Sequence, residues 1–448
     1  MIVMKFGGTS VEDATAIDRS CGIVAERIGR KPFVVVSALA GTTNGLLEAA
    51  RLAAAGELDR ALSTIATLEQ RHIALLPDTA TDFAALRDVL RSIGNSPELT
   101  PRLRDQVASF GEIMSSRIFA DRMRQHGHRT VHVDARDIMI TDGNFGKAAP
   151  LEALVAERFR DHVRPHLEAG TVVIMGGFIG STTNGETTTL GRGASDYSAA
   201  IAGAAMDVEE IQIWTDVDGM MTTDPRIVAD AWKVKNISFS EASELAYFGA
   251  KVLFPLSVVP AIEKNIPVLI LNSRKPAGTG TRITREAQKC SNPIKSIAMK
   301  RGITVVTVTS SRMLMAYGFL RSLFEVFDRR RTSVDMIATS EVSVSLTLDD
   351  TSALPAIIPD LEAFGEVTVD QNRTLICLVG ANLKYTPGIA SRIFSSIRDI
   401  NVLMISHGAS TINMSFLVDG QDADTAVRNL HAEFFQNLDP EVFEPPHR

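Results

Sequence analysis

The stretch IVMKFGGTS, residues 2–10, decides the fold of the amino-terminal part of the chain. Its first residues are apolar apart from Lys5, which is typical of a strand buried in a parallel sheet. The two glycines let backbone N–H groups approach an anion, and a helix is predicted directly after them, over 11–29. This order of strand, glycine turn and helix predicts an α/β unit. The turn with Lys5 either cradles a phosphate or is an ordinary tight connection.

The same alternation of apolar runs and helical periodicity continues to residue 271, which indicates parallel strands joined by helical crossovers. Further strands are predicted over 33–37, 130–134, 171–175, 211–215 and 268–271. Between the second and third strands, residues 45–125 show almost continuous helical periodicity, with Thr100 as a candidate N-cap and Pro101 at the first helical position. We therefore expect a helical subdomain inserted in the sheet.

The composition excludes several classes of protein. The chain has 448 residues, 45% of them hydrophobic, and a net charge of −7, so neither disorder nor binding to nucleic acid is expected. Its 3 cysteines, without a C-x-x-C pair, argue against a disulfide framework or a structural zinc site and favour the reducing cytoplasm. No apolar run is long enough for a membrane span, and no signal peptide is expected.

A repeat follows a predicted linker at 272–296. The segments 318–348, GFLRSLFEVFDRRRTSVDMIATSEVSVSLTL, and 387–418, PGIASRIFSSIRDINVLMISHGASTINMSFLV, have the same order of helix and two strands. With strands predicted at 303–309 and 374–379, each repeat predicts a ferredoxin-like β-α-β-β-α unit. The expected domains are 1–275, 296–370 and 371–448, and interleaving of the last two stays open.

Small, hydroxyl-rich loops follow the predicted strands, at the edge where open α/β sheets bind ligands. They are SALAGTTN at 37–44, TTTLGRGASD at 187–196, TDVDG at 215–219 and TTDPR at 222–226. Glycines, hydroxyls and an arginine at a helix start suit an anionic ligand. The loops TDVDG and TTDPR are equally compatible with plain turn chemistry.

Together with FGE at 110–112 and FGAKVL at 248–253, these segments resemble the aspartate kinases. The resemblance covers essentially the whole chain. It implies the amino-acid kinase fold, a mainly parallel sheet sandwiched by helices with a helical insert, followed by two ferredoxin-like ACT domains of βαββαβ order. It also implies the monofunctional, lysine-sensitive type, which transfers the γ-phosphate of Mg-ATP to the side-chain carboxylate of L-aspartate. The products are 4-phospho-L-aspartate and ADP, in the first step of lysine, threonine and methionine synthesis.

The resemblance assigns residues to each part of the reaction. The implied catalytic residues are Lys5, Gly8 and Asp196, and the implied aspartate-binding residues are Ser37, Thr43, Glu112, Arg192 and Ser195. Glu112 would pair with the α-ammonium and Arg192 with the α-carboxylate. The implied ATP-binding residues are Lys5, Gly7, Gly8, Thr9, Thr215, Asp216, Met221, Arg226, Lys251 and Val252. Mg²⁺ would enter with ATP, and no protein ligand for it is assigned. Met221, Phe254 and Ala194 depart from the usual pattern of the family.

The carboxyl-terminal repeat resembles the regulatory part of lysine-inhibited relatives. The implied effector-binding residues are Met313, Gly318, Phe319, Leu320, Ser333, Val334, Asp335, Ser340 and Glu341. Asp335 and Glu341 could hold the two ammonium groups of lysine, although an ordinary strand start and core residues would produce the same pattern, and threonine or a second effector stays open. The resemblance also implies a homodimer through the ACT domains, and doubling of this dimer to a tetramer stays open.

Two other functions remain compatible with these residues. Another amino-acid kinase would share the sheet but should lack the context of Glu112, the long helical insert and the paired ACT units. A non-catalytic amino-acid sensor could keep the fold without turnover, although Lys5, Glu112, Arg192 and Asp196 argue against it.

Overall fold

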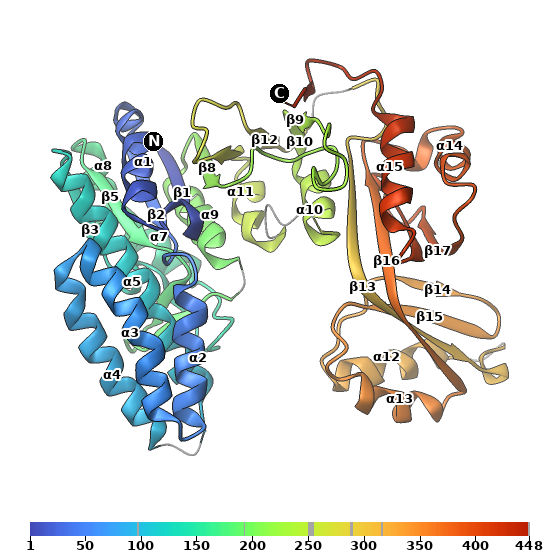
Figure 1. Cartoon of the computed structure of the whole chain (residues 1–448), viewed down its shortest axis with the longest axis horizontal. Coiled ribbons are helices and arrows are strands. Elements are labelled where there is room, and N and C mark those ends of the chain that lie inside the picture. The colour runs from blue at the N-terminus through green and yellow to red at the C-terminus, as the bar shows by residue number, and fades with distance from the viewer. Residues whose placement is uncertain (96–97, 192, 250–254, 287–289, 315–316, 447–448) are drawn as a thin grey trace. The chain divides into compact units, whose positions relative to one another are not determined.

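The computed structural model describes residues 1–95, 98–191, 193–249, 255–286, 290–314 and 317–446. The chain divides into two compact units (Figure 1). The first contains residues 1–220, 235–239 and 252–287, and the second contains 221–234, 240–251 and 288–448. Within the described ranges, no helix is long and apolar enough to cross a membrane.

The first unit is built on an eight-stranded sheet with β1 (Ile2–Phe6) near its centre. β1 pairs in parallel with both β2 (Pro32–Val36) and β8 (Glu210–Thr215), and every residue of β2 is buried. The full order is β10 (Asn236–Ser238), β12 (Thr281–Thr284), β11 (Val268–Asn272), β8, β1, β2, β5 (Val172–Gly176) and β3 (Thr130–Val133). Only the pairing of β11 with β12 is antiparallel among the described strands of this sheet. The predicted α/β fold with a mainly parallel sheet is confirmed.

The helical insert is confirmed, but the prediction of almost continuous helix is wrong. The insert consists of α2 (Thr42–Ala54), α3 (Leu58–Leu75), α4 (Ala80–Gly94) and α5 (Pro101–Gln125), which project from the sheet in Figure 1. Gly56, with φ of 81°, separates α2 from α3, and Pro77 begins a short 3-10 helix after α3. Thr100 caps α5 as predicted, since its Oγ1 accepts from the Leu103 N–H at 3.3 Å. The insert has its own hydrophobic core, which includes Leu46, Ile65, Phe83 and Leu90.

A hairpin that the periodicity did not predict crosses the ligand-binding edge of the first unit. It consists of β6 (Ile179–Thr182) and β7 (Thr187–Thr189), and β4 (Ile140–Thr141) pairs with β6. Its strands are too short and too rich in Gly and Thr to give an apolar alternation. The hairpin leads into α9 (Ala194–Met206). The helix after the first strand is also shorter than predicted, since α1 covers Ala14–Ala25.

The remaining short helices of this unit complete the crossovers. They are α6 (Ala135–Ile138), α7 (Glu152–Arg158), a π-helical segment (Phe159–Val163), α8 (Arg164–Glu168) and α11 (Val259–Glu263), with 3-10 segments at Gly8–Ser10, Ile28–Arg30, Pro77–Thr79 and Pro255–Val258. The helix α10 (Phe239–Tyr247) passes from the first unit into the second at Ser240.

The second unit contains one six-stranded sheet. Its order is β14 (Ile337–Thr339), β15 (Ser343–Leu348), β13 (Ser296–Thr309), β16 (Glu366–Val379), β18 (Asn413–Asp419) and β17 (Val402–His407). The helices α12 (Phe319–Arg329) and α13 (Leu354–Glu362) share a core with the first half of this order, and α14 (Ile389–Ser396) and α15 (Ala423–Phe434) follow in the chain. A short strand pair, β9 (Lys233–Val234) with β19 (Phe443–Glu444), and 3-10 segments at Ser311–Met313 and Leu383–Tyr385 complete the unit.

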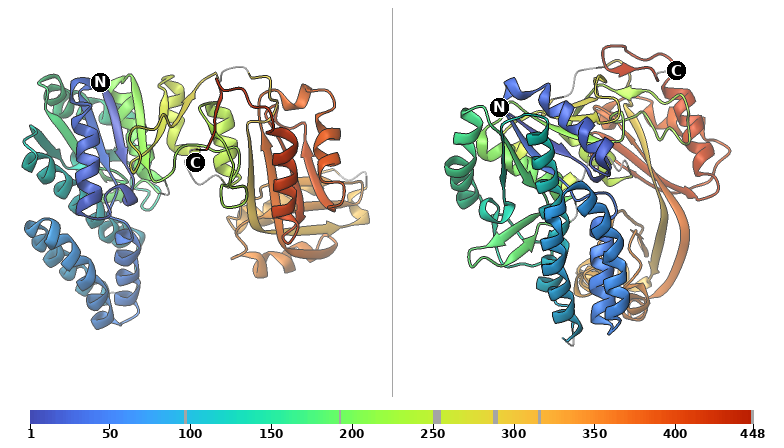
Figure 2. Two further views of the ribbon diagram at one scale, coloured as in Figure 1. Left: turned by 45° about the horizontal axis from the view of Figure 1, so that its top comes forward. Right: turned by 60° about the vertical axis from the view of Figure 1, so that its left-hand side comes forward.

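The two long central strands pass through both predicted ACT repeats. β13 and β16 have 14 residues each and lie antiparallel along most of their length (Figure 2). β13 pairs with β16 in both halves, residues 296–301 with 374–379 and residues 305–309 with 366–370, and its residues 304–309 also pair with β15. The predicted strand at 303–309 therefore begins earlier than expected, at Ser296, and the predicted domain boundary at 370–371 falls inside β16.

Candidate active site

A pocket of about 410 Å³ opens at the carboxyl ends of β1, β2 and β5, the edge at which open α/β sheets bind ligands. The residues predicted from separate parts of the sequence meet there. The pocket is lined by, among others, Lys5, Gly8, Ser37, Thr43, Glu112, Ser195 and Asp196. The fold therefore brings the predicted catalytic residues and most of the predicted aspartate-binding residues into one cavity.

Lys5 and Asp196 form an ion pair in the pocket wall. The Lys5 Nζ lies 2.6 Å from Asp196 Oδ1, and the two side chains are only 11% and 12% exposed. Asp196 lies in the first turn of α9, where the helix dipole favours a carboxylate. The carboxylate thereby fixes the Lys5 ammonium at the end of β1, next to the turn that contains Gly7 and Gly8.

The turn after β1 needs glycine because it lies close to the backbone of the loop after β2. A Cβ on Gly8 would lie 3.0 Å from the Ala38 carbonyl oxygen, so a larger residue would push the turn away from the loop after β2. The Gly7 N–H donates to the Trp214 carbonyl at 3.0 Å, which ties the turn to the end of β8. Thr9, predicted with them, lies in the following 3-10 segment.

Glu112 lies on α5 and is 4% exposed. Its Oε1 accepts from the Ala38 N–H at 3.2 Å, and its Oε2 has no hydrogen-bond partner within the described residues. Burial raises the pKa of Glu112 to about 8, against the smaller lowering by the Ala38 N–H. A buried carboxyl with an unused oxygen facing a polar pocket is suited to bind a cation from the ligand.

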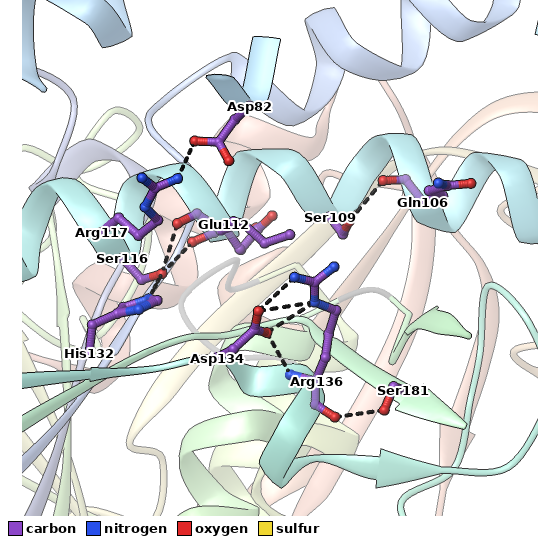
Figure 3. Close-up of polar contacts among 11 residues, drawn as sticks. Asp82, Gln106, Ser109, Glu112, Ser116, Arg117, His132, Asp134, Arg136 and Ser181 are labelled. Carbon is purple, nitrogen blue, oxygen red and sulfur yellow. Dashed lines mark hydrogen bonds and ion pairs between the residues drawn. The ribbon is translucent and has the colours of Figure 1, made fainter. Parts of the chain in front are cut away.

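The backbone carbonyl of Glu112 also makes contacts that fix its position. The Ser116 Oγ donates to the Glu112 carbonyl at 2.8 Å and lies 3.0 Å from the His132 Nε2 of β3 (Figure 3). A Cβ on Gly176 would come within 3.0 Å of the same carbonyl, so α5 packs directly on the end of β5. This turn of α5 is therefore fixed against the sheet.

Asp105 is a positioning residue that the sequence did not indicate. It is 2% exposed and lies two helical turns before Glu112. Its Oδ1 accepts from Thr189 Oγ1 at 2.7 Å, and its Oδ2 accepts from the Thr189 and Gly146 N–H groups at 2.9 and 2.8 Å. It thus anchors the end of β7, two residues before Gly191 of the pocket wall. An aspartate in a helical window has no distinctive signal, because most such residues are solvated.

Replacing Asp105 by Asn is expected to weaken the hydrogen bonds that fix the end of β7 beside the pocket. The amide oxygen in the place of Oδ2 can still accept from both backbone N–H groups, but the NH₂ then faces the Thr189 hydroxyl, so that hydrogen bond must reverse its direction. All three hydrogen bonds also lose the contribution of the negative charge. We expect a loss of about 1–3 kcal/mol in the free energy of unfolding and a severalfold higher KM for the amino-acid substrate, with kcat changed less. Thermal unfolding and steady-state kinetics measure both quantities. An unchanged melting temperature together with an unchanged KM would contradict the role of Asp105.

Arg71 in the helical insert holds two loops of the pocket. Its guanidinium donates to the Ala40 carbonyl at 2.7 Å and to the Glu12 carbonyl at 2.5 Å. Ala40 belongs to the pocket wall, and Glu12 follows the glycine turn. The insert therefore also positions the pocket, a role that a lone arginine on a helix does not reveal in the sequence.

The predicted ATP-binding residues other than those of the glycine turn fall into three groups. Thr215 and Asp216 lie at the end of β8, beside β1, and the Thr215 carbonyl accepts from Ser273, which is hydrogen bonded to Ser10. Met221 and Arg226 belong to the second unit, where Arg226 pairs with Asp224 at 2.6 Å. Lys251 and Val252 lie outside the described residues. The predicted aspartate-binding residue Arg192 and the departure at Phe254 lie outside them as well.

The predicted effector-binding residues lie in the second unit. Met313, Phe319 and Val334 pack against the core beneath α12 and α13. Gly318 precedes α12 with φ of 79°, and Ser340 Oγ lies 2.7 Å from Ser343 Oγ. Leu320, Ser333 and Glu341 are exposed, whereas the Asp335 side chain is covered.

A second hollow, of about 640 Å³, lies elsewhere in the first unit. Its walls include His132, Arg136, Arg158, His162 and His166. Although it is larger, none of the predicted catalytic or substrate-binding residues lines it, so the pocket at Lys5 and Glu112 is the candidate active site.

Comparisons with known proteins identify the family of the chain. Residues 1–272 match the amino acid kinase family, and residues 376–434 match an ACT domain. The chain is 38% identical to lysine-sensitive aspartokinase 3 of Escherichia coli, over 97% of the chain and 99% of the relative. It is also 38% identical to the chloroplastic aspartokinase 3 of Arabidopsis thaliana, over 97% of the chain and 81% of the relative.

Solved structures give the same result. The structure of E. coli aspartokinase III in complex with aspartate and ADP is similar with a TM-score of 0.84 and 37% identity, over 97% of this chain and all of the other. The complex of the same enzyme with lysine and aspartate has a TM-score of 0.83, with the same identity and coverage. The chain belongs to the amino acid kinase family and, within it, to the aspartokinases with carboxyl-terminal ACT domains.

Proposed function

We propose that this chain is an aspartate kinase whose active site is the pocket between Lys5 and Glu112. An oxygen of the aspartate side-chain carboxylate attacks the γ-phosphorus of ATP, and the bond from that phosphorus to the bridging oxygen breaks. The products are 4-phospho-L-aspartate and ADP. The observation that carries the proposal is that the buried Glu112 and the Lys5–Asp196 ion pair line one pocket. Glu112 can bind an ammonium group and Lys5 can bind a phosphate in the same cavity.

The reaction does not need a general base from the protein. A free aspartate side chain has a pKa near 3.9, so it is already ionised at neutral pH. The site must instead position two anions and compensate the charge that moves during phosphoryl transfer. Lys5 and the Gly8 backbone N–H are suited to hold the phosphates, while the Gly7 N–H fixes the turn by donating to the Trp214 carbonyl, and Asp196 fixes Lys5.

Substrate recognition divides among the pocket walls. Glu112 would bind the α-ammonium of aspartate, and the hydroxyls of Ser37, Thr43 and Ser195 would position its carboxylates. Arg192 remains a predicted partner of the α-carboxylate. Thr215 and Asp216, at the same edge of the sheet, are proposed for the nucleotide, with Met221, Arg226, Lys251 and Val252 as further predicted contacts.

Mg²⁺ is proposed to enter bound to the phosphates of ATP, which is its usual mode in kinases. The described ranges contain no group of three or more His, Cys, Asp or Glu residues arranged to hold a metal ion. Asp196 lines the pocket and Asp216 directly follows β8, and these carboxylates could add a ligand. Bound there, the ion would neutralise phosphate charge.

The pKa of Glu112 predicts how aspartate binding depends on pH. In the free site this carboxyl, with a pKa of about 8, is mostly protonated at pH 7. A bound ammonium favours the ionised form, so binding releases a proton and affinity rises as pH increases toward 8. We expect KM for aspartate to fall by up to about tenfold per pH unit between pH 6 and 8 and to level off above. Steady-state kinetics across this range measure it, and a KM independent of pH would contradict it.

L-Lysine is the proposed effector, bound through Asp335 and Glu341 of the second unit.

A homodimer is the proposed assembly. The edge strands β14 and β17 expose Ile337, Leu403 and Ile405 at 46%, 43% and 48%. Apolar edge strands favour pairing with a second chain. Light scattering after size-exclusion chromatography distinguishes monomer, dimer and tetramer.

A cytoplasmic location stays a prediction, based on the three unpaired cysteines.

The proposal is tested by ADP release from Mg-ATP with L-aspartate or L-glutamate as acceptor, each with and without L-lysine. Turnover that depends on aspartate and is suppressed by lysine supports both catalytic and regulatory roles. Preference for glutamate would indicate another amino-acid kinase. Absence of turnover in folded protein that still binds lysine would favour a non-catalytic sensor.

A further inference from the structure

The carboxylate proposed to hold the effector is already occupied by the chain itself. The Asp335 side chain is only 2% exposed. Its Oδ1 accepts a hydrogen bond from the Tyr247 hydroxyl, at the end of α10, and its Oδ2 lies 3.7 Å from the Lys300 Nζ of β13. A ligand that uses Asp335 must first displace these groups.

Lys300 lies in a site that suits a primary ammonium. Its Nζ is 2.6 Å from Asp349 Oδ2, in addition to its contact with Asp335. The Tyr247 ring centroid lies 5.1 Å from the same nitrogen, within the range of a cation–π contact. Two carboxylates and one aromatic face thus surround the ammonium. We call Asp335, Asp349 and Tyr247 the ammonium cage.

We propose that the ammonium cage binds the side-chain ammonium of a free basic amino acid, and that Lys300 is an internal competitor which fills the cage when this effector is absent. The inference rests on the proposed lysine effector. The side chain of Lys300 ends in the same butyl-ammonium group as free L-lysine, so the cage that accepts one has the chemistry to accept the other. The effector must replace Lys300 and open the Tyr247 hydrogen bond.

The cage is joined to a segment proposed for catalysis. Tyr247 ends α10, and Lys251, a predicted ATP-binding residue, follows four positions later in the chain. Between them, Gly249 has φ of 121°, and a Cβ on it would lie 2.2 Å from the Met299 carbonyl oxygen. The segment after α10 is thus pressed against β13 one residue before Lys300. Displacing Lys300 and opening the Tyr247 hydrogen bond therefore acts on β13 and on the end of α10.

The competition is tested by calorimetric titration of L-lysine into the full-length wild-type protein and the variants Lys300→Met and Tyr247→Phe. Lys300→Met removes the competing ammonium, and Tyr247→Phe keeps the ring but removes the hydroxyl that holds Asp335. Each is expected to lower the Kd for lysine by about three- to tenfold, since binding no longer breaks that contact. Arg301→Met is the matched control, because Arg301 is the neighbouring cation on β13 but pairs with Asp424.

Norleucine, which has the shape of lysine without its side-chain ammonium, should not gain affinity in either variant. Unchanged or weaker lysine binding by both Lys300→Met and Tyr247→Phe, when wild type binds lysine, would overturn the internal competition alone. Failure of wild type and all variants to bind lysine would overturn the proposed effector and this inference together. Kinase turnover without lysine is measured separately and tests the catalytic proposal independently.

Discussion

Replacing Lys5 by methionine is expected to lower kcat by about a thousandfold while KM for aspartate changes little. The ammonium lies at the end of β1 beside the glycine turn, where it can compensate the charge that develops as the γ-phosphoryl group leaves ADP. Methionine keeps the length of the side chain and removes the charge. Steady-state kinetics with both substrates measure the effect, and a kcat within threefold of wild type would place Lys5 away from the transferred group.

A double variant separates this catalytic loss from a structural one. Lys5 and Asp196 are almost buried, so Lys5→Met leaves a buried carboxylate without its ion-pair partner and is expected to destabilise the fold as well. Lys5→Met combined with Asp196→Asn removes both charges. We expect the double variant to regain melting temperature but not turnover. Recovery of turnover together with stability would show that Lys5 acts only through folding.

Replacing Glu112 by glutamine is expected to lower kcat/KM for aspartate by about a hundredfold, mainly through KM, and to leave KM for ATP nearly unchanged. Glutamine fits the same space and can still accept from the Ala38 N–H, but it cannot supply a negative charge to the α-ammonium. Loss of one partner of a buried charge pair costs about 2–5 kcal/mol, which corresponds to this range. The variant should also lose the fall of KM between pH 6 and 8.

The matched control for Glu112 is Glu48→Gln. Glu48 lies on α2, at the surface, and pairs there with Arg51. This variant should keep wild-type kinetics and the wild-type pH dependence. If Glu112→Gln binds aspartate as tightly as this control, the ammonium of the substrate must lie elsewhere in the pocket.

The parts of the fold that the sequence predicts well are those with a clear apolar period. β1, β2, β5 and β8 are runs of Val and Ile bounded by turn residues, and all were expected close to their observed positions. The breaks in the helical insert were missed because helical periodicity continues across Gly56 and Pro77. The hairpin of β6 and β7 was missed because short Thr- and Gly-rich strands have no apolar alternation. The extension of β13 back to Ser296 was missed because Lys300, Arg301 and Gly302 interrupt the apolar run.

The site, too, has residues that the sequence predicts and residues that it does not. Lys5, Glu112 and Asp196 were predicted from motifs, and the parallel sheet brings them to one pocket because the loops after its strands share an edge. Asp105 and Arg71 position that pocket through hydrogen bonds to backbone groups more than 30 residues away, and such contacts depend on the tertiary fold alone. The covering of Asp335 by Tyr247 and Lys300 likewise joins segments that no local pattern connects.

The identity of the phosphorylated group is the most direct test of the proposed chemistry. The protein is incubated with Mg-ATP and L-aspartate in the presence of hydroxylamine, which traps an acyl phosphate as its hydroxamate, and the product is identified by mass spectrometry and NMR. The proposed reaction predicts the hydroxamate of the side-chain carboxylate, formed only with ATP and lost in Lys5→Met. Formation of the α-hydroxamate, or of none by folded wild-type protein, would contradict it.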